Sequence, residues 1–504
     1  MTWYYTVIFV VLCLVGHATA RCKTQVNTTS LPRFHVTFTP DFAFNNYKLH
    51  GNLVLDGDFS PNETFLMLPT ELFSLPGTKD GGNGLAAFDN KGSLPLGSNE
   101  TIGPYSQPHR TWTVQRATEG PITISFTHQP APVNVKALPG PLYDLRAGTN
   151  GLIGSMWAVV PAPSPLSNIE YNISLEWNIT ERQSAAFTWK DGKGRHIYQF
   201  NATLRQLLQT FFMVGDIKGY PSIPTNTTFG MYWLENPPFD ISAVGTYVKD
   251  FLEFSSKFWQ DAYQKSYHVF ARINDEVAIT PGGSALLQSF AFGYNKEAGI
   301  SSDRIRTLLA HEMTHNWTPW RDGTLAERSR YNEGAAEYWS LRLLWRAGLM
   351  SSSDYLQEMN QRAFDYYTNP AVNMSDEAAQ EIAWTLRPAQ RIPYGRGMIH
   401  LLNIDTQLRT SESGRLEDIA IPFVQICRQQ DACGAPEWFN LLRERLGEGA
   451  IHEWDQVSTG FPLIKPLDDS LGPCFDVVQN SSSPIVWVWQ AKDGLDISSP
   501  DCLI

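Results

Sequence analysis

Apolar and polar residues alternate in several short runs through the first 215 residues of the chain. The clearest runs are 33–38 (RFHVTF), 47–55 (YKLHGNLVL), 122–126 (ITISF) and 171–177 (YNISLEW). A period of two is typical of strands that bury one face. Glycine-rich, turn-forming sequence separates some of these runs, above all between residues 76 and 104. The pattern therefore predicts an antiparallel β domain over residues 21–215.

The spacing of apolar residues becomes helical near residue 240. In residues 242–262 they recur at intervals of three and four, which favours an amphipathic helix. Residues 268–294 return to strand and loop composition, and helix start and stop signals recur from Ser302 to about residue 455. We therefore expect an α+β protein in which a mixed α/β domain, residues 216–400, follows the β domain. A helical part, residues 401–470, and an irregular tail, residues 471–504, complete the chain.

Composition excludes several classes of protein. The 504 residues are 42% hydrophobic and 18% charged, which is enough apolar sequence for a large core and excludes wholesale disorder. The formal net charge of -12 argues against a nucleic-acid partner and against a polybasic membrane anchor. A mean hydropathy of -0.25 excludes a polytopic membrane protein. The oligomeric state is left open.

The N-terminus has the features of an export signal. An apolar run from Thr6 to Val15 is too short to span a bilayer, and Ala18-Thr19-Ala20 forms a small-x-small cleavage pattern. We therefore predict a signal peptide over residues 1–20 and a secreted chain without a stable membrane anchor. Glycosylation is expected as well, because N-x-S/T occurs at Asn27, Asn62, Asn99, Asn172, Asn178, Asn201, Asn226, Asn316, Asn373 and Asn480.

Cysteine usage agrees with an oxidising compartment. Of the six cysteines, Cys13 leaves with the signal peptide. Cys427 and Cys433 are close enough in sequence to close a small loop, and Cys474 and Cys502 can link the ends of the tail, but spacing alone leaves the connectivity open. Cys22 then remains, either free or paired elsewhere.

A candidate metal site lies at the sequence His-Glu-Met-Thr-His, residues 311–315, within a predicted helix. Positions i and i+4 share one face of a helix, so His311 and His315 present two imidazoles to one point at a spacing suited to zinc. Glu312 lies beside them, where it can take a proton from a metal-bound water. The alternative to a metal site is that the two histidines are simply an exposed polar pair on a soluble helix.

A third ligand is expected from the next helix. A catalytic zinc takes three protein ligands and keeps one position open for water. The sequence NEGAAEYW, residues 332–339, begins an apolar helix that carries Glu333 and Glu337 on one face. Carboxylates in so apolar a helix need a partner, and either glutamate can reach the metal.

These two motifs resemble the HExxH…E zinc site of the gluzincin metallopeptidases. HEMTHNW followed by NEGAAEYW is similar to the HExxHxW…NEG pattern of the aminopeptidase N family. The resemblance implies a thermolysin-like catalytic domain over residues 216–400 and one zinc ion per chain. It also implies His311, His315 and Glu333 as ligands and Glu312 as general base.

The downstream sequence resembles the glycyl aminopeptidase family more closely. Pro-Tyr-Gly-Arg-Gly, residues 393–397, opens a predicted helix, and the resemblance gives Tyr394 a role in stabilising the oxyanion. The alternative for Tyr394 is simple packing. Both families carry a glycine-rich strand with a glutamate, and the matching stretch here, residues 282–287 (GGSALL), has none. Exopeptidase and endopeptidase modes therefore both stay open.

The expected function is that of a secreted zinc peptidase that hydrolyses bonds in a peptide or protein substrate. Two rival hypotheses remain. One is a related zinc hydrolase that acts on a non-peptide bond, and the other is a secreted binding protein that keeps the peptidase scaffold without turnover. The complete motif argues against the second rival, because a lapsed site often loses its base or a ligand.

Overall fold

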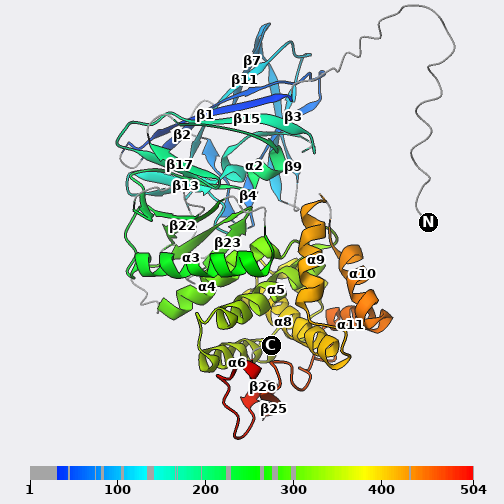
Figure 1. Ribbon diagram of the computed structural model, residues 1–504. Coiled ribbons are helices and arrows are strands. Elements are labelled where there is room, and N and C mark those ends of the chain that lie inside the picture. Colours follow the sequence, from blue (N-terminus) through cyan, green and yellow to red (C-terminus); the bar gives the residue numbers. More distant parts are fainter. Residues whose placement is uncertain are drawn as a thin grey trace, which may run out of the picture.

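The computed structural model describes most of the chain after residue 30. The described residues are 31–43, 46–73, 75–80, 84–103, 107–132, 141–164, 166, 168–193, 196–222, 229–261, 266–274, 282–296, 302–430 and 433–502. The predicted signal peptide, Cys22 and the sequons at Asn27 and Asn226 lie outside them. A β-rich half lies above a helical half, with a small mixed layer between them (Figure 1).

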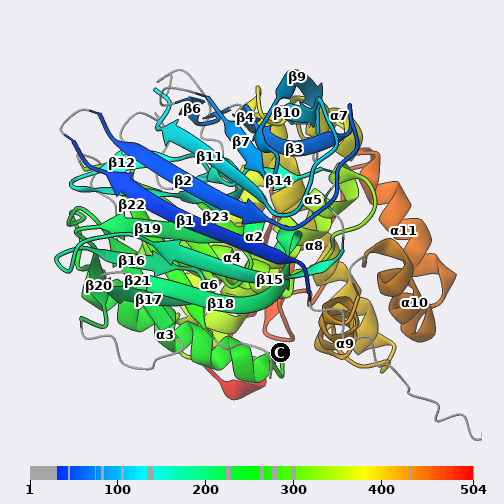
Figure 2. The same ribbon diagram turned by 90° about the horizontal axis from the view of Figure 1, so that it is seen from above.

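The largest sheet has eight strands and contains all four runs predicted from the period of two. Alternate residues of β1 (Arg33–Asp41) are buried, because its even-numbered positions from Phe34 to Phe38 face the core. β1 pairs antiparallel with β2 and parallel with β15, and it runs diagonally across the near face of the molecule in Figure 2. The other strands are β2 (Lys48–Leu55), β6 (Lys79–Asp80), β7 (Ala86–Asp89), β8 (Gly92–Leu94), β11 (Ile122–Gln129), β15 (Glu170–Trp177) and β18 (His196–Thr203).

Two smaller sheets and a short hairpin complete the β half. One sheet has the order β14–β3–β10–β9, with β3 (Thr64–Pro69), β9 (Leu96–Ile102), β10 (Pro108–Val114) and β14 (Ala162–Pro163). The other has the order β12–β13–β19–β16–β17, with β12 (Arg146–Gly148), β13 (Gly151–Ser155), β16 (Ser184–Phe187), β17 (Lys190–Lys193) and β19 (Phe211–Gly215). The hairpin pairs β4 (Glu71–Leu72) with β5 (Leu75–Pro76), and the short helices are α1 (Met156–Val159) and α2 (Leu204–Leu208).

The middle layer is a five-stranded sheet in the order β20–β21–β22–β24–β23. Its strands β21, β22 and β24 run parallel, whereas β23 is antiparallel to β24 and forms an edge. The bounds are β20 (Lys218–Tyr220), β21 (Phe229–Trp233), β22 (Tyr267–Ile273), β23 (Gly282–Leu286) and β24 (Ser289–Tyr294). The predicted helix after residue 240 is α3 (Ile241–Phe258), and the Asp240 carboxylate accepts bonds from its first amides.

Helices form the lower half, as predicted from Ser302 onward. They are α4 (Ser302–Thr314), α5 (Leu325–Arg346), α6 (Ser352–Tyr367), α7 (Asp376–Ile382), α8 (Arg387–Thr410), α9 (Glu417–Arg428), α10 (Ala435–Leu446) and α11 (Glu448–Ser458). The tail forms the ribbon β25 (Phe475–Ser482) and β26 (Ile485–Ala491), which lies beside α6 (Figure 1). Both predicted disulfides are present, Cys427–Cys433 and Cys474–Cys502.

The helical core is continuous with the middle sheet. One buried cluster extends from Phe229 to Cys502, while a second occupies the β half from Phe34 to Val214. α8 runs without a break through residue 400, so the proposed division at that residue rests on sequence composition alone. Within the described residues, no helix has the length and apolar composition to cross a membrane.

Two glycines allow α5 and α8 to touch at their backbones. A β-carbon at Gly397 would lie 2.1 Å from the carbonyl oxygen of Arg330 and 2.8 Å from Gly334 Cα. A β-carbon at Gly334 would lie 2.4 Å from the backbone of Gly397. Real β-carbons do not approach backbone atoms this closely, so a side chain at either position forces the two helices apart.

We predict that Gly397→Ala lowers the free energy of unfolding by about 1–3 kcal/mol, because backbone atoms cannot move aside as a flexible side chain can. Gly449→Ala is the matched control, since Gly449 is also helical and has nothing within 4 Å of its β-carbon position. That control gains stability or stays unchanged, because alanine is the better helix former. Thermal and urea unfolding of the two variants measure the difference, and equal stabilities would contradict the packing argument.

Candidate metal centre and active site

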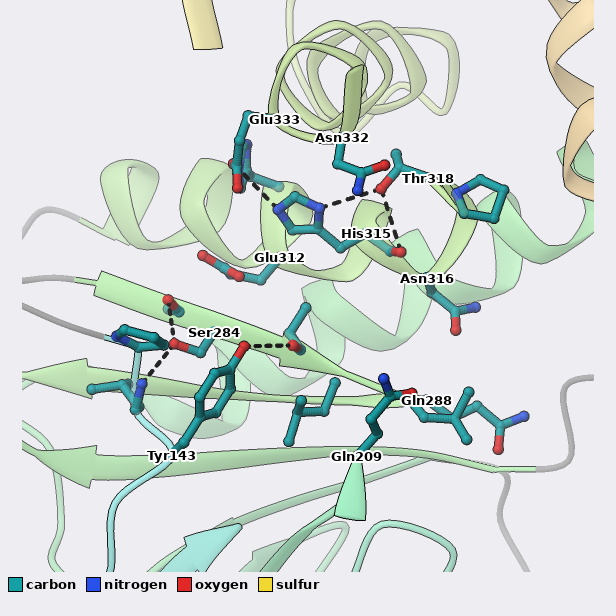
Figure 3. Close-up of a pocket in the computed structure, with 18 of the residues that line it drawn as sticks. Tyr143, Gln209, Ser284, Gln288, Glu312, His315, Asn316, Thr318, Asn332 and Glu333 are labelled. Atoms are coloured by element: carbon teal, nitrogen blue, oxygen red, sulfur yellow. Dashed lines mark hydrogen bonds and ion pairs between the residues drawn. The ribbon is translucent and has the colours of Figure 1, made fainter. Parts of the chain in front are cut away.

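A large cleft opens where the β half faces the helices. It has a volume of about 2850 Å³, and all five predicted site residues line it. Strand β23 forms one wall and helices α4, α5 and α8 contribute the other. Figure 3 shows Glu312, His315 and Glu333 on the helical side of the cleft, across from the strand that carries Ser284.

Three candidate ligands come together at the centre of this cleft. Ligand atoms of His311, His315 and Glu333 all lie within 4.8 Å of one another. The Oε2 of Glu333 is 3.3 Å from the Nε2 of His311 and 3.5 Å from the Nε2 of His315. Two imidazole nitrogens and one carboxylate oxygen that converge in this way form a donor set typical of zinc.

Local helix geometry explains how the two histidines meet. α4 ends at Thr314 and continues as a 3-10 turn over His315–Trp317. The imidazole centroids are 4.9 Å apart with their planes at 87°, and the Nε2 atom of each ring lies close to Glu333 Oε2. Trp317 anchors the turn, because its indole Nε1 donates to Asp261 at 2.9 Å and its ring stacks on Trp259.

Neighbouring polar groups orient the imidazoles. The Nδ1 of His315 lies 3.3 Å from the Thr318 hydroxyl, which leaves Nε2 directed at Glu333. On the other ring, the Nδ1 of His311 is 3.7 Å from Glu337 Oε1. Thr318 was not predicted as a site residue, because nothing in the sequence marks it except its position three residues after His315.

Glu337 has a different environment from Glu333, although both lie on the same helical face. Its carboxylate is paired with Arg362 and lies 3.4 Å from a guanidinium nitrogen of Arg391. Burial raises the pKa of Glu337, but Arg362 and His311 outweigh it and lower the pKa to about 2. Glu337 therefore remains an anion, and its negative charge lies 3.7 Å from the Nδ1 of His311.

Glu333 and Glu312 differ in the direction in which their surroundings shift the pKa. Burial raises the pKa of Glu333, but the adjacent His315 and His311 outweigh burial and hold that pKa well below its usual range. For Glu312 burial prevails, and its pKa is raised above the usual value. A raised pKa suits a carboxylate that has to take up and release a proton.

Glu312 packs directly against the edge strand. A β-carbon at Gly283 would lie 2.4 Å from Glu312 Cγ, so only glycine admits the carboxylate at this position. The adjacent Ser284 turns away, because its hydroxyl bonds to the Gly283 carbonyl and accepts from the amide of Leu142. No glutamate stands on this strand, as the sequence indicated.

Tyr394 lies on the first turns of α8 and faces His311, His315 and Glu333, which together are called the metal group below. Its ring stacks on His311 with centroids 5.6 Å apart and planes at 11°. The guanidinium of Arg391 covers the ring at 3.7 Å from its centroid. Burial, together with the nearby Glu333 carboxylate, raises the pKa of Tyr394, so the hydroxyl keeps its proton at neutral pH.

Comparison with known proteins identifies the fold class of the chain. No family model matches the chain, and no curated protein is similar to it in sequence. An aminopeptidase N family protein from Idiomarina loihiensis has a TM-score of 0.64 and 14% identity, over 88% of this chain and 79% of that one. An M1 zinc metallopeptidase from Deinococcus radiodurans has a TM-score of 0.54 and 14% identity, over 87% of this chain and 96% of that one.

A mutant zinc metallopeptidase from Deinococcus radiodurans, bound to a Tyr-Ser-Ala substrate, has a TM-score of 0.53 and 12% identity over 87% of this chain and 96% of that one. Identities this low establish the fold alone. The chain therefore has the α+β fold found in M1 zinc metallopeptidases, with β sheets first and helices after them.

We predict that Glu333→Gln loses bound zinc, because the amide oxygen is a neutral and weaker ligand. Glu337→Gln is the matched control, one helical turn further along the same face of α5. It keeps the metal with reduced affinity, because it removes only a group that orients His311. Metal analysis of the purified variants after dialysis distinguishes them, and loss of zinc from the control alone would reverse the ligand assignment.

Proposed function

We propose that the chain is a secreted zinc-dependent peptidase, with His311, His315 and Glu333 as metal ligands. The observation that carries the proposal is the convergence of two imidazoles and one carboxylate beside a buried Glu312, on the wall of a large open cleft. The similarity in fold to M1 zinc metallopeptidases supports the peptide substrate.

The donor chemistry fits zinc. Glu333 Oε2 lies 3.3 Å from His311 Nε2 and 3.5 Å from His315 Nε2, and a divalent cation between them satisfies all three lone pairs at once. When bound there, zinc polarises a carbonyl group and makes a water molecule a stronger acid.

The chain's own residues then move the protons. Glu312 accepts the proton of the attacking water and returns it to the leaving amine as the peptide bond breaks. Burial prepares it for this exchange by raising its pKa. The Tyr394 hydroxyl donates to the oxygen that gains negative charge, and the stacking of its ring on His311 places it beside the metal group.

Turnover of peptides tests the proposal directly. The zinc-loaded protein is mixed with aminoacyl substrates and with internally quenched peptides, with and without a chelator. We expect hydrolysis that the chelator abolishes and that added zinc restores. Glu312→Gln keeps its zinc and loses turnover, because an amide cannot act as the base. Zinc-loaded protein that cleaves no peptide would favour the binding-protein alternative, and cleavage of ester or epoxide substrates alone would favour the non-peptide hydrolase.

Tyr394→Phe separates an oxyanion donor from a packing residue. We expect the variant to fold, retain zinc and keep KM nearly constant while kcat falls by about 10²–10³. The loss is confined to kcat because the hydrogen bond strengthens only in the transition state. A packing role instead gives lower stability with near-normal turnover, so steady-state kinetics and thermal unfolding are measured on the same sample.

Secretion rests on the predicted signal peptide, and the glycosylation pattern gives it a test. Of the sequons in the described residues, Asn62, Asn99, Asn172, Asn178, Asn201, Asn373 and Asn480 are exposed. Asn316 differs, because its Nδ2 is buried in the wall of the cleft. We expect glycopeptide mapping of the secreted protein to find glycans on exposed sequons and none on Asn316. A glycan on Asn316 would contradict the placement of this turn.

A further inference from the structure

One face of α8 carries two arginines into the cleft beside the metal group. Arg387, Arg391 and Tyr394 are spaced by four and three residues, which places them on one side of the helix. All three line the cleft. Neither arginine belongs to the metal group or to the proton-transfer steps.

The two arginines differ in their partners. Arg391 lies over the Tyr394 ring and reaches Glu337 Oε1 at 3.4 Å. Arg387 donates to the amide oxygen of Gln390. Across the described part of the chain, no carboxylate lies within 4 Å of the Arg387 guanidinium. Burial and repulsion from Arg391 lower the pKa of Arg387, as expected for a cation that lacks an anionic neighbour.

An aromatic wall covers this end of the cleft. Phe73, at the tip of the β4–β5 hairpin, lies 5.2 Å from Trp384 and 6.2 Å from Tyr143 between ring centroids. Trp384 precedes Arg387 by three residues, and the Tyr143 hydroxyl donates to the carbonyl of Ala285 on β23. A half-buried guanidinium beside such a wall attracts an anion more strongly than it would in water, because the local dielectric is lower.

Three carboxylates lie next to the candidate ligands on the helical side of the cleft, and they differ in their partners. Glu333 faces both histidines, and Glu337 is paired with arginines. Glu312 packs on Gly283, and β23 carries no acidic side chain. An α-amino group placed next to Arg387 would be repelled by it, whereas a carboxylate would be attracted.

We propose that Arg387 binds a carboxylate of the substrate, so that the cleft selects peptides with an acidic group near the scissile bond. The inference rests on the proposed peptidase function and names the substrate class of the same site. A planar guanidinium with its fork of N–H donors matches a carboxylate in two parallel hydrogen bonds. The carboxylate belongs either to an aspartate or glutamate side chain or to the C-terminus of a short peptide.

Matched peptides distinguish these two sources. One series carries Glu or Gln at each position around the cleavage site, and a second ends in a free or an amidated carboxyl group. We expect kcat/KM to be about tenfold higher for the charged member at one position or at the C-terminus, as one charge-assisted hydrogen bond provides.

The variant Arg387→Gln tests whether Arg387 is responsible for the preference for acidic peptides. We expect the ratio of kcat/KM for the Glu and Gln peptides to fall to about one, with zinc content and thermal unfolding measured alongside. Arg443→Gln is the control, because it removes the same charge from an exposed ion pair with Glu448. It leaves the ratio unchanged. No acidic preference in either series, or a preference that survives in Arg387→Gln, would overturn the proposal.

Binding separates this inference from the proposed turnover. Fluorescence anisotropy follows a labelled acidic peptide and its amide counterpart on the zinc-loaded Glu312→Gln protein, which does not consume them. A preference for the acidic peptide that depends on Arg387 supports the inference even if the wild-type chain cleaves neither peptide. Equal binding of the two peptides, together with cleavage of neutral peptides, would contradict this inference and would still support the peptidase function.

Discussion

Backbone contact between α5 and α8 is the constraint on which the candidate active site depends. Gly334 follows Glu333 directly, and Gly397 lies three residues after Tyr394. Because neither glycine has a side chain, the two helices approach until a β-carbon at Gly397 would be only 2.1 Å from a carbonyl oxygen. This approach brings Glu333 from one helix and Tyr394 from the other into contact with His311.

Close packing also buries several carboxylates, and nearby cations offset the cost of burying their charge. Glu312, Glu333 and Glu337 are all largely buried near two histidines, and uncompensated carboxylates at such depth are unstable. Arg362 and Arg391 hold Glu337 as an anion, while the histidines hold Glu333. Glu312 has neither kind of direct partner, and its raised pKa suits proton transfer. Arg387 is the remaining cation on this face and is directed at the cleft.

Much of the fold could be predicted, because the signals are local. Period-two alternation found β1, β2, β11 and β15, and the apolar spacing found α3 within a few residues of its observed ends. The two disulfides join pairs of cysteines that spacing had suggested, although spacing alone left the connectivity open. The parallel pairing of β1 with β15 could not be predicted, since the strands are about 130 residues apart in sequence and no local pattern records which edge a distant strand will join.

The sequence by itself determined which chemistry was available: an HExxH helix, a second helix with two glutamates, and a tyrosine in a third, which begins at Arg387 and not at Pro393 as predicted. Tertiary structure decided how these groups are used. Glu333 and Glu337 share one helical face, so spacing cannot choose between them, whereas the position of α5 against α4 and α8 directs the first at the histidines and the second at the arginines. Gly283 and the Phe73 hairpin reach the cleft from other elements of the fold. Such contacts depend on packing between segments far apart in the chain, and local sequence patterns carry no record of them.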